Sequence, residues 1–190
     1  MAEALLEKNN HALAAREGKY LTFTLAHQEY GLEIMKVKEI IGAMEVTTVP
    51  QTPAYVEGVI NLRGKIIPVV NLRLKFGMEF LEHTDRTCII VTEIKGRSGS
   101  IPMGMVVDSV SEVMNIRKEE MEETPNFGVK LDTEYIMGMA KAKGKVVILL
   151  DINQVLNAEG MLLMESLKSD QCGDKDMRSS LDEEQREEEK

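Results

Sequence analysis

The histidines and cysteines, the residues best suited to metal binding and nucleophilic catalysis, are few and widely separated in this sequence. The 190 residues include three histidines and two cysteines: His11, His27, His83, Cys88 and Cys172. No two of them stand at the spacing of a recognised metal-binding motif. The glycines and serines form no nucleophile elbow, P-loop or dinucleotide-binding motif. A catalytic site assembled from distant residues is the one catalytic possibility left open. Because the local motifs are missing, we predict no catalytic residue, no metal site and no cofactor.

The charge balance points away from nucleic acid and membrane. Lysine and arginine number 23 against 32 aspartates and glutamates, giving a formal net charge of −9. A nucleic-acid-binding protein gains most of its affinity from basic residues, and this chain has no tryptophan and only 4% aromatic residues for base stacking. No apolar run reaches the roughly 18 residues that cross a bilayer, and the first residues lack a signal-peptide pattern. We expect a cytoplasmic protein in a reducing compartment.

Composition divides the chain into four segments. Residues 1–17 favour a helical leader, although the apolar stripe is weak. Residues 18–157 contain every proline and most of the valine and isoleucine, and we assign the folded domain to them. Residues 158–168 again favour a helix. Residues 169–190 carry nine acidic and four basic residues with few large apolar ones, so we predict a disordered acidic tail.

Short apolar runs in the central segment predict a mostly β protein. The predicted strands are 20–25, 28–34, 58–62, 65–71, 87–94, 103–107 and 145–150, with short helices at 72–76 and 151–157. Turns are expected around His27 and at Arg63–Gly64, where glycine can adopt a positive φ. Pro68 interrupts its run, so that strand is expected to lie at a sheet edge or to carry a bulge. The glycine- and serine-rich residues 96–100 are predicted to form a loop.

Two blocks of sequence recur in the same order. GVINLRGKIIPVVNL (58–72) aligns with GMAKAKGKVVILLDI (138–152), and YGLEIMKVKEII (30–41) aligns with MGMVVDSVSEVM (103–114). Two unrelated hairpins would share turn glycines and apolar residues, but they would not share block order and charged positions such as Glu39 and Glu112. We infer an internal duplication. A repeat of about 70 residues with about five short strands is the size of a small SH3- or OB-like barrel. The predicted fold is therefore two small five-stranded β-barrels with short peripheral and terminal helices.

The most specific stretch is PAYVEGVINLRGKIIPVVNLRLKFG (53–77), with its Asn61-Leu62-Arg63-Gly64 turn. Together with YLTFTLAHQEYGLEIMKVKEII (20–41), MGMVVDSVSEVM (103–114) and LDTEYIMGMAKAKGKVVILLDINQVL (131–156), it resembles the CheW-like domain family, the bacterial chemotaxis coupling module. The resemblance covers about residues 18–157. It implies two intertwined five-stranded barrels with a shared apolar core, and we expect the midpoint between them near residues 83–86.

The resemblance also implies a function without catalysis. Family members act as adaptors that bind the regulatory domain of the histidine kinase CheA and the cytoplasmic tips of methyl-accepting chemoreceptors. By resemblance, this chain links receptor and kinase in membrane-associated signalling arrays and is a monomer when free. Two alternatives stay open: a regulatory barrel module of another kinase complex, and an OB-type nucleic-acid-binding protein, which the net charge disfavours.

Six residues match partner-contacting positions of the family: Arg63, Val37, Glu39, Ile66, Cys88 and Val110. Arg63 at a turn tip can pair with a partner's carboxylate, although it could equally hold a carboxylate of its own barrel. Glu39 lies in an apolar run, so it is expected to be exposed or paired, but its repeat in Glu112 also fits a structural role.

The other matched positions have structural alternatives as well. Ile66, Cys88 and Val110 match an apolar groove that suits a helical hairpin, and each could instead belong to the core. Asn61, Gly58 and Gly64 are assigned to the structure of the turn.

Overall fold

The computed structural model describes residues 16–96, 99–122 and 135–156. The chain divides into two compact units, 1–155 and 156–190, and all the helices and strands named below lie in the first unit. Most of the predicted leader helix, and all of the predicted helix 158–168 and acidic tail 169–190, lie outside the described residues.

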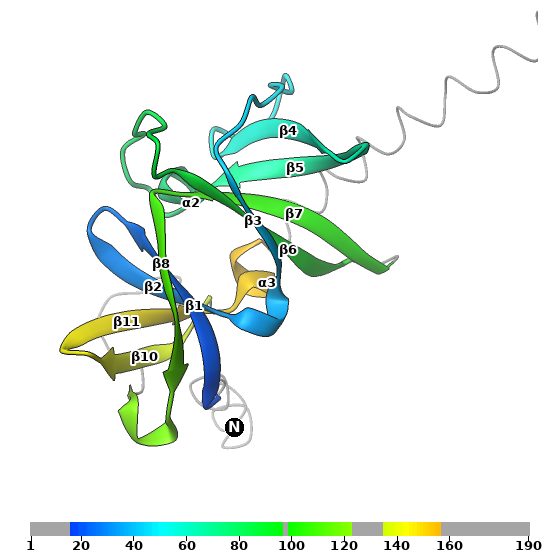
Figure 1. The fold of residues 1–190 in the computed structure, drawn as a ribbon. Coiled ribbons are helices and arrows are strands. Elements are labelled where there is room, and N and C mark those ends of the chain that lie inside the picture. Colours follow the sequence, from blue (N-terminus) through cyan, green and yellow to red (C-terminus); the bar gives the residue numbers. More distant parts are fainter. Residues whose placement is uncertain (1–15, 97–98, 123–134, 157–190) are drawn as a thin grey trace, which may run out of the picture. The chain divides into compact units, whose positions relative to one another are not determined.

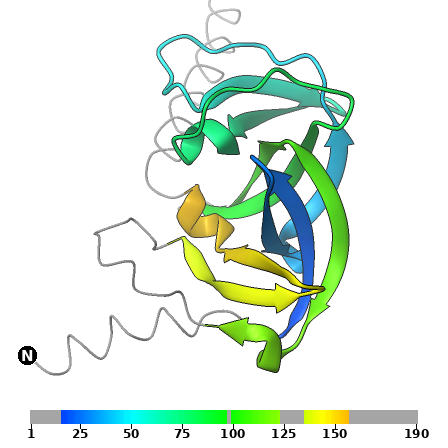
Figure 2. The same cartoon turned by 90° about the vertical axis from the view of Figure 1, so that its left-hand side faces the viewer.

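The described elements are mainly short strands. They are β1 (Gly18–Leu25), β2 (Gln28–Glu33), β3 (Val37–Gly42), β4 (Val56–Leu62), β5 (Lys65–Asn71), β6 (Cys88–Gly96), β7 (Gly99–Val107), β8 (Ser109–Ile116), β9 (Met121–Glu122), β10 (Ile136–Ala142) and β11 (Lys145–Leu150). Two α-helical turns, α2 (Leu72–Lys75) and α3 (Ile152–Val155), and two 3-10 turns, η2 (Ile34–Lys36) and η3 (Lys118–Glu120), complete the set. Figure 2 shows α2 and α3 on the same side of the molecule.

The strands form two sheets, which we call sheet A and sheet B (Figure 1). Sheet A has the order β8-β1-β2-β11-β10-β9, and sheet B has the order β3-β6-β7-β5-β4. The strand orders of the two sheets correspond, with β1 and β2 in sheet A taking the places of β6 and β7 in sheet B. The predicted class of two small five-stranded barrels is confirmed, with two differences: sheet A gains the two-residue strand β9, and each sheet stays open at its edges.

The duplicated halves are interleaved between the sheets. We call β1 to α2 copy 1 and β6 to α3 copy 2. Each sheet takes strands from both copies, because β1 pairs with β8, β2 with β11, β3 with β6 and β5 with β7. Within a copy, the pairings are hairpins of neighbouring strands together with the short β9–β10 ladder. Neither sheet can therefore be assembled from one copy.

Equivalent registers in the two sheets confirm the duplication. Val69 of β5 lies opposite Gly104 of β7, and Leu149 of β11 lies opposite Gly31 of β2, in two parallel ladders. These four residues are the ones that the sequence alignment pairs. A Cβ on Gly31 would lie 2.8 Å from Leu149 Cδ2, and one on Gly104 would lie 2.9 Å from Ile89 Cγ2. Both glycines are therefore required where neighbouring strands pack closely over a core.

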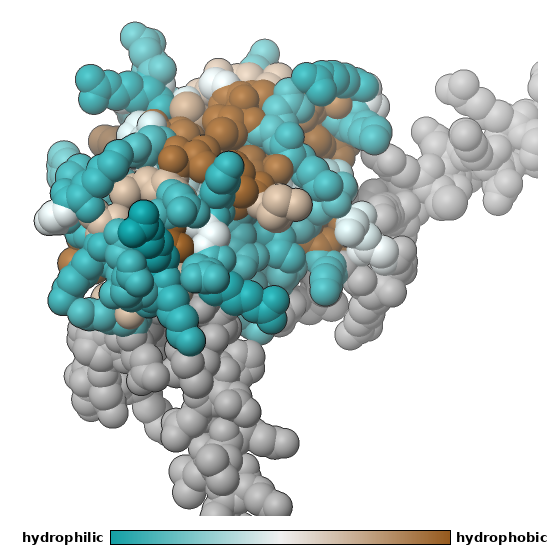
Figure 3. Space-filling model, turned by 60° about the horizontal axis from the view of Figure 1, so that its bottom comes forward, coloured by the Kyte–Doolittle hydropathy of each residue, from teal (hydrophilic) through white to brown (hydrophobic). Residues whose placement is uncertain are grey.

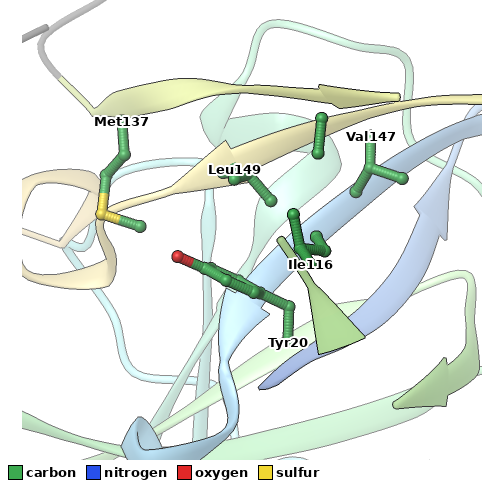
Figure 4. Close-up of a cluster of buried hydrophobic side chains, with 6 residues drawn as sticks. Tyr20, Ile116, Met137, Val147 and Leu149 are labelled. Atoms are coloured by element: carbon green, nitrogen blue, oxygen red, sulfur yellow. The ribbon is translucent and has the colours of Figure 1, made fainter. Parts of the chain in front are cut away.

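Each sheet encloses its own apolar cluster. In sheet A the cluster comprises Tyr20, Ile116, Met137, Ala140, Val147 and Leu149 (Figure 4). In sheet B it comprises Ile60, Ile67, Val69, Ile89, Val91 and Val106. Strands β1 and β7 also contact each other across the sheets, and the opposite faces of both are buried at Leu21, Phe23, Met103 and Met105. An apolar layer between the sheets therefore joins them, as the family resemblance implied.

Several sequence predictions need correction. Pro68 lies in β5, which is an interior strand of sheet B; the parallel ladder with β7 starts only at Val69, and the bulge lies in β4 between Val56 and Gly58. The predicted loop at 96–100 is shorter, because Gly96 and Gly99 still pair as the ends of β6 and β7. Strands β3, β8 and β10 were not among the predicted strands.

Candidate partner-binding surface

Arg63 and Glu39 form an ion pair that links opposite edges of sheet B. Arg63 lies in the β4–β5 turn with φ 52°, followed by Gly64 with φ 81°. The Asn61 side chain accepts a hydrogen bond from the Gly64 N–H at 2.9 Å and holds the turn. Arg63 Nη2 lies 2.6 Å from Glu39 Oε1 on the edge strand β3, while 78% of the Arg63 side chain stays exposed. The turn thus presents a paired guanidinium at the surface.

The same pair is repeated in sheet A. Lys143 lies in the β10–β11 turn with φ 52°, and its Nζ lies 2.5 Å from Glu112 Oε2 on the edge strand β8. Lys143 and Glu112 are the repeat equivalents of Arg63 and Glu39. Each open sheet is therefore bridged by a turn-tip cation and an edge-strand carboxylate. In the structure, Arg63 binds a carboxylate of its own barrel, which is the structural alternative to a partner contact.

Exposed apolar residues accompany both ion pairs. The most exposed large apolar side chains of the described residues include Ile40 at 42% and its equivalent Val113 at 48%, with Ile66 at 56% and its equivalent Val146 at 45%. Figure 3 shows apolar side chains reaching one face as a continuous area bordered by polar residues. Ile66 follows the Arg63 turn on the outer face of β5, so it is accessible to a partner and does not belong to the core.

The remaining predicted residues are not gathered at one place. Val37 lies opposite Thr92 and Cys88 lies opposite Gly42, at the two ends of the β3–β6 ladder. Val110 belongs to the other sheet, on β8 opposite Phe23. All three predicted residues are partly buried, which leaves their surface role a prediction.

Gly58 lies within β4 and not in the turn, which corrects its assignment to the turn. It has φ 142° and sits at the β4 bulge, and a Cβ there would lie 2.0 Å from the Thr47 carbonyl oxygen. Its role is to allow close approach of the chain before β4. Asn61 and Gly64 do belong to the turn, as assigned.

Sequence reasoning missed the second ion pair and its apolar neighbours. The repeat itself was the available signal, because the same alignment that matches Glu39 with Glu112 also carries Arg63 to Lys143 and Ile66 to Val146. The pairing within each site depends on how the sheets curl, and no local pattern reports that.

His83 and Cys88 have structural partners. His83 Nε2 lies 3.2 Å from Glu57 Oε1, and the Cys88 thiol donates to the Arg86 carbonyl at 3.3 Å. Within 16–96, 99–122 and 135–156, no group of three or more histidine, cysteine or acidic side chains is placed to hold a metal ion. In that same part of the chain, no helix has the length and apolar character to span a membrane.

The open, duplicated β architecture with a paired cation at the β4–β5 and β10–β11 turns defines a two-sheet β domain, and comparison with known proteins places it in a family. A model of the CheW-like domain matches residues 19–160, so the chain belongs to the CheW-like domain family.

Named relatives and a solved structure agree with this assignment. The chain is 38% identical over 149 residues to the chemotaxis protein CheW of Klebsiella aerogenes, covering 78% of this chain and 87% of the relative. It is 33% identical over 142 residues to the CheW of Bacillus subtilis, covering 74% and 88%. The crystal structure of the scaffolding protein TtCheW from Thermoanaerobacter tengcongensis matches with a TM-score of 0.67 and 35% identity, covering 76% of this chain and 96% of that one.

Proposed function

We propose that this chain is a non-catalytic chemotaxis adaptor that couples methyl-accepting chemoreceptors to the histidine kinase CheA. The observation that supports it most strongly is the family match across the whole described domain, with relatives that are named chemotaxis and scaffolding proteins. In this role the chain works in the cytoplasm and is recruited to membrane-associated receptor arrays. It supports kinase activation and control by holding the two partners together.

The partner-binding surface that we propose is centred on Arg63, Glu39 and Ile66. An exposed guanidinium held beside a carboxylate presents both a donor and an acceptor, and Ile66 adds an apolar contact. Exposed ion pairs contribute little to stability, so the fold does not depend on this pair and a partner can recognise it. Val37, Cys88 and Val110 are proposed as further partner contacts at separate places on the two sheets.

The test is calorimetric titration of this protein with the regulatory domain of the CheA kinase from the same source. We expect saturable binding of one regulatory domain per chain. Absence of binding at micromolar concentrations, with both proteins folded by circular dichroism, would overturn the coupling role while leaving the fold assignment intact.

A further inference from the structure

Asp108 is the single residue between β7 of sheet B and β8 of sheet A, where the chain crosses from one sheet to the other. Its Oδ2 accepts a hydrogen bond at 2.9 Å from the Ala26 N–H, in the β1–β2 turn of sheet A. The same oxygen lies 2.6 Å from Arg73 Nη1 on α2, which directly follows β5 of sheet B. One carboxylate oxygen therefore ties a turn of sheet A to the end of sheet B.

This ion pair is shielded from water, unlike the pairs at the turn tips. Only 14% of the Arg73 side chain and 22% of the Asp108 side chain are exposed, against 78% for Arg63. The guanidinium is also fixed on its other side, because Arg73 Nε donates to the Glu79 carbonyl at 2.9 Å. A charge pair held away from water is screened less by salt, and its hydrogen bonds define one geometry. It can therefore set the orientation of the elements that it joins.

A row of stacked aromatic rings makes a second connection at the same helical turn. Phe76 is the C-cap residue of α2, and its ring stacks on two tyrosines from sheet A. The ring centroids lie 5.8 Å from Tyr30 on β2 and 5.1 Å from Tyr135, the residue before β10. Tyr30 stacks in turn on Phe23 of β1 at 5.8 Å. Helical turn α2 is therefore docked on sheet A by a charge pair and by aromatic contacts.

The equivalent crossing in copy 1, from sheet A to sheet B, is built differently. The repeat alignment places Met35 at the position of Asp108, and its offset carries Arg73 to Asn153. Met35 is 85% exposed, and Asn153 Oδ1 accepts from the Lys95 N–H at 3.3 Å. A solvent-exposed thioether cannot form a charge pair with α3. The charged connection between the sheets therefore belongs to the Asp108 crossing and has no equivalent at Met35.

We propose that Arg73 and Asp108 are positioning residues that hold sheet A and sheet B in the orientation in which one coupling partner contacts both. This role rests on the proposed function, in which the candidate contacts Val37 and Cys88 lie on sheet B and Val110 lies on sheet A. Val110 follows Asp108 by two residues, so a shift at the crossing moves this contact relative to sheet B. A binding surface built on two elements needs such support from residues outside it.

Spin labels measure the orientation directly. Lys65 at the start of β5 in sheet B and Lys145 at the start of β11 in sheet A are both exposed. Both are changed to cysteine and labelled in a Cys88→Ser and Cys172→Ser background, and pulsed electron paramagnetic resonance gives the distribution of distances between the labels. We expect Arg73→Met, which keeps an apolar stem but removes the guanidinium, to broaden this distribution. An unchanged distribution would overturn the proposal.

Assembly is measured by co-sedimentation with receptor arrays and the kinase, using proteins that keep their natural cysteines. We expect Arg73→Met to weaken assembly about tenfold and Arg73→Lys, which keeps a cation opposite Asp108, to retain most of it. The matched control Lys141→Met removes an ion pair that lies within sheet A, between Lys141 Nζ and Glu122 Oε1 at 2.7 Å. A second control, Ile60→Val, lowers stability through the core of sheet B. Both controls should assemble like the parent, and an equal loss in Ile60→Val would assign the defect to stability and overturn the positioning role.

The two measurements separate this role from the coupling function itself. A parent chain that assembles with neither kinase nor receptor would overturn the coupling function and the role in coupling, while the spin-label distances would still decide whether Arg73 orients the sheets. If the parent assembles and Arg73→Met assembles equally well, the proposed function stands and the positioning role is overturned.

Discussion

Arg63 and Lys143 occupy equivalent turns but carry different cations. Arg63 can bind a carboxylate through two parallel N–H groups, whereas the Lys143 ammonium is a point charge without that geometry. Both are well exposed, at 78% and 66% of their side chains, and each lies against a carboxylate of an edge strand. An exposed pair of this kind contributes about 0–1 kcal/mol to stability. The difference between the two turns is therefore best sought in binding.

Reversing the Arg63–Glu39 pair separates an internal role from a partner contact. We predict that Arg63→Ala lowers the free energy of unfolding by less than about 1 kcal/mol but weakens assembly with kinase and receptor. The double variant Glu39→Arg with Arg63→Glu restores an ion pair of opposite polarity. If the partner recognises the guanidinium at the turn, assembly stays weak in this double variant, as measured by co-sedimentation with receptor arrays.

The matched control for this pair is Lys143→Ala, which removes the equivalent cation from sheet A. We expect it to leave assembly with the kinase domain close to that of the parent. Recovery of assembly in the reversed double variant would instead assign Arg63 to bridging the edges of its own sheet.

Two buried tyrosines make stability depend on alkaline pH. Burial raises the pKa of Tyr20 and Tyr30 above the ordinary value of 10.0, with the charge of Glu33 adding to the effect on Tyr20. The folded state therefore holds these protons more tightly than the unfolded state. Their contribution is fully present below about pH 10 and is lost as the pH rises through the raised values.

We predict that Tyr30→Phe flattens the fall in stability above pH 10. The change amounts to at most one proton, or about 1.4 kcal/mol per pH unit. Urea unfolding at several pH values between 9 and 11.5 measures the slope, and absorbance at 295 nm follows tyrosine ionisation. An unchanged slope in the variant would show that Tyr30 ionises as easily in the folded protein as in the unfolded one.

At the scale of the elements, the parallel ladders depend on two glycines. Gly31→Ala places a methyl group against Leu149, which is fully buried, so the side chain cannot move aside cheaply. We predict a loss of about 1–3 kcal/mol from overpacking, partly offset by the lower entropy of the unfolded chain. Gly104→Ala is expected to behave alike, because its Cβ would meet Ile89. Thermal and urea unfolding measure both.

Gly42→Ala is the control for these substitutions. Gly42 lies in β3 with nothing within 4 Å of an added Cβ, so the variant is expected to be neutral or slightly stabilising. Equal losses in all three variants would mean that the cost comes from the strand backbone and not from contact of the added methyl group with Leu149 or Ile89.

The sequence predicted the strands that carry clear apolar runs and missed those whose apolar pattern is weak. Strands β5 and β11 were predicted with their observed bounds, because their apolar runs end at clear turn residues. Strand β3 alternates only between half-buried and exposed residues, and β10 contains glycine, alanine and lysine, which have low strand propensity. Strand β3 forms because β6 of the other copy pairs with it, and β10 forms between β9 and β11 of its own copy; no local window contains the β3–β6 pairing.

The candidate site shows the same division. The Arg63-Gly64 turn and the role of Asn61 could be predicted, since turn chemistry is local. The contact of Arg63 with Glu39 could not, because it joins residues 24 positions apart across the two edges of a curled sheet. The placement of Val110 in the opposite sheet likewise follows from the exchange of strands between copies.

For the whole molecule, interleaving makes the two halves mutually dependent. Copy 1 alone retains the β1–β2 and β4–β5 hairpins, and copy 2 alone retains the β6–β7 and β10–β11 hairpins with β9. Isolated hairpins are at best marginally stable in water. The apolar clusters of both sheets also draw residues from both copies, as with Tyr20 and Ile116 in sheet A. Each half by itself therefore lacks a complete core.

We predict that fragments 1–85 and 86–190 are each unfolded when separate and fold when mixed. Far-ultraviolet circular dichroism should show little strand signal for either fragment, and an equimolar mixture should recover the spectrum of the intact chain. Titration of one fragment against the other should saturate at one to one. Joining the fragments removes a bimolecular step, so the intact chain should refold at a rate independent of concentration, whereas the mixture should refold faster at higher concentration. A fragment that shows a cooperative unfolding transition alone would mean that one copy can build a core from its own strands, contrary to the ladders described above.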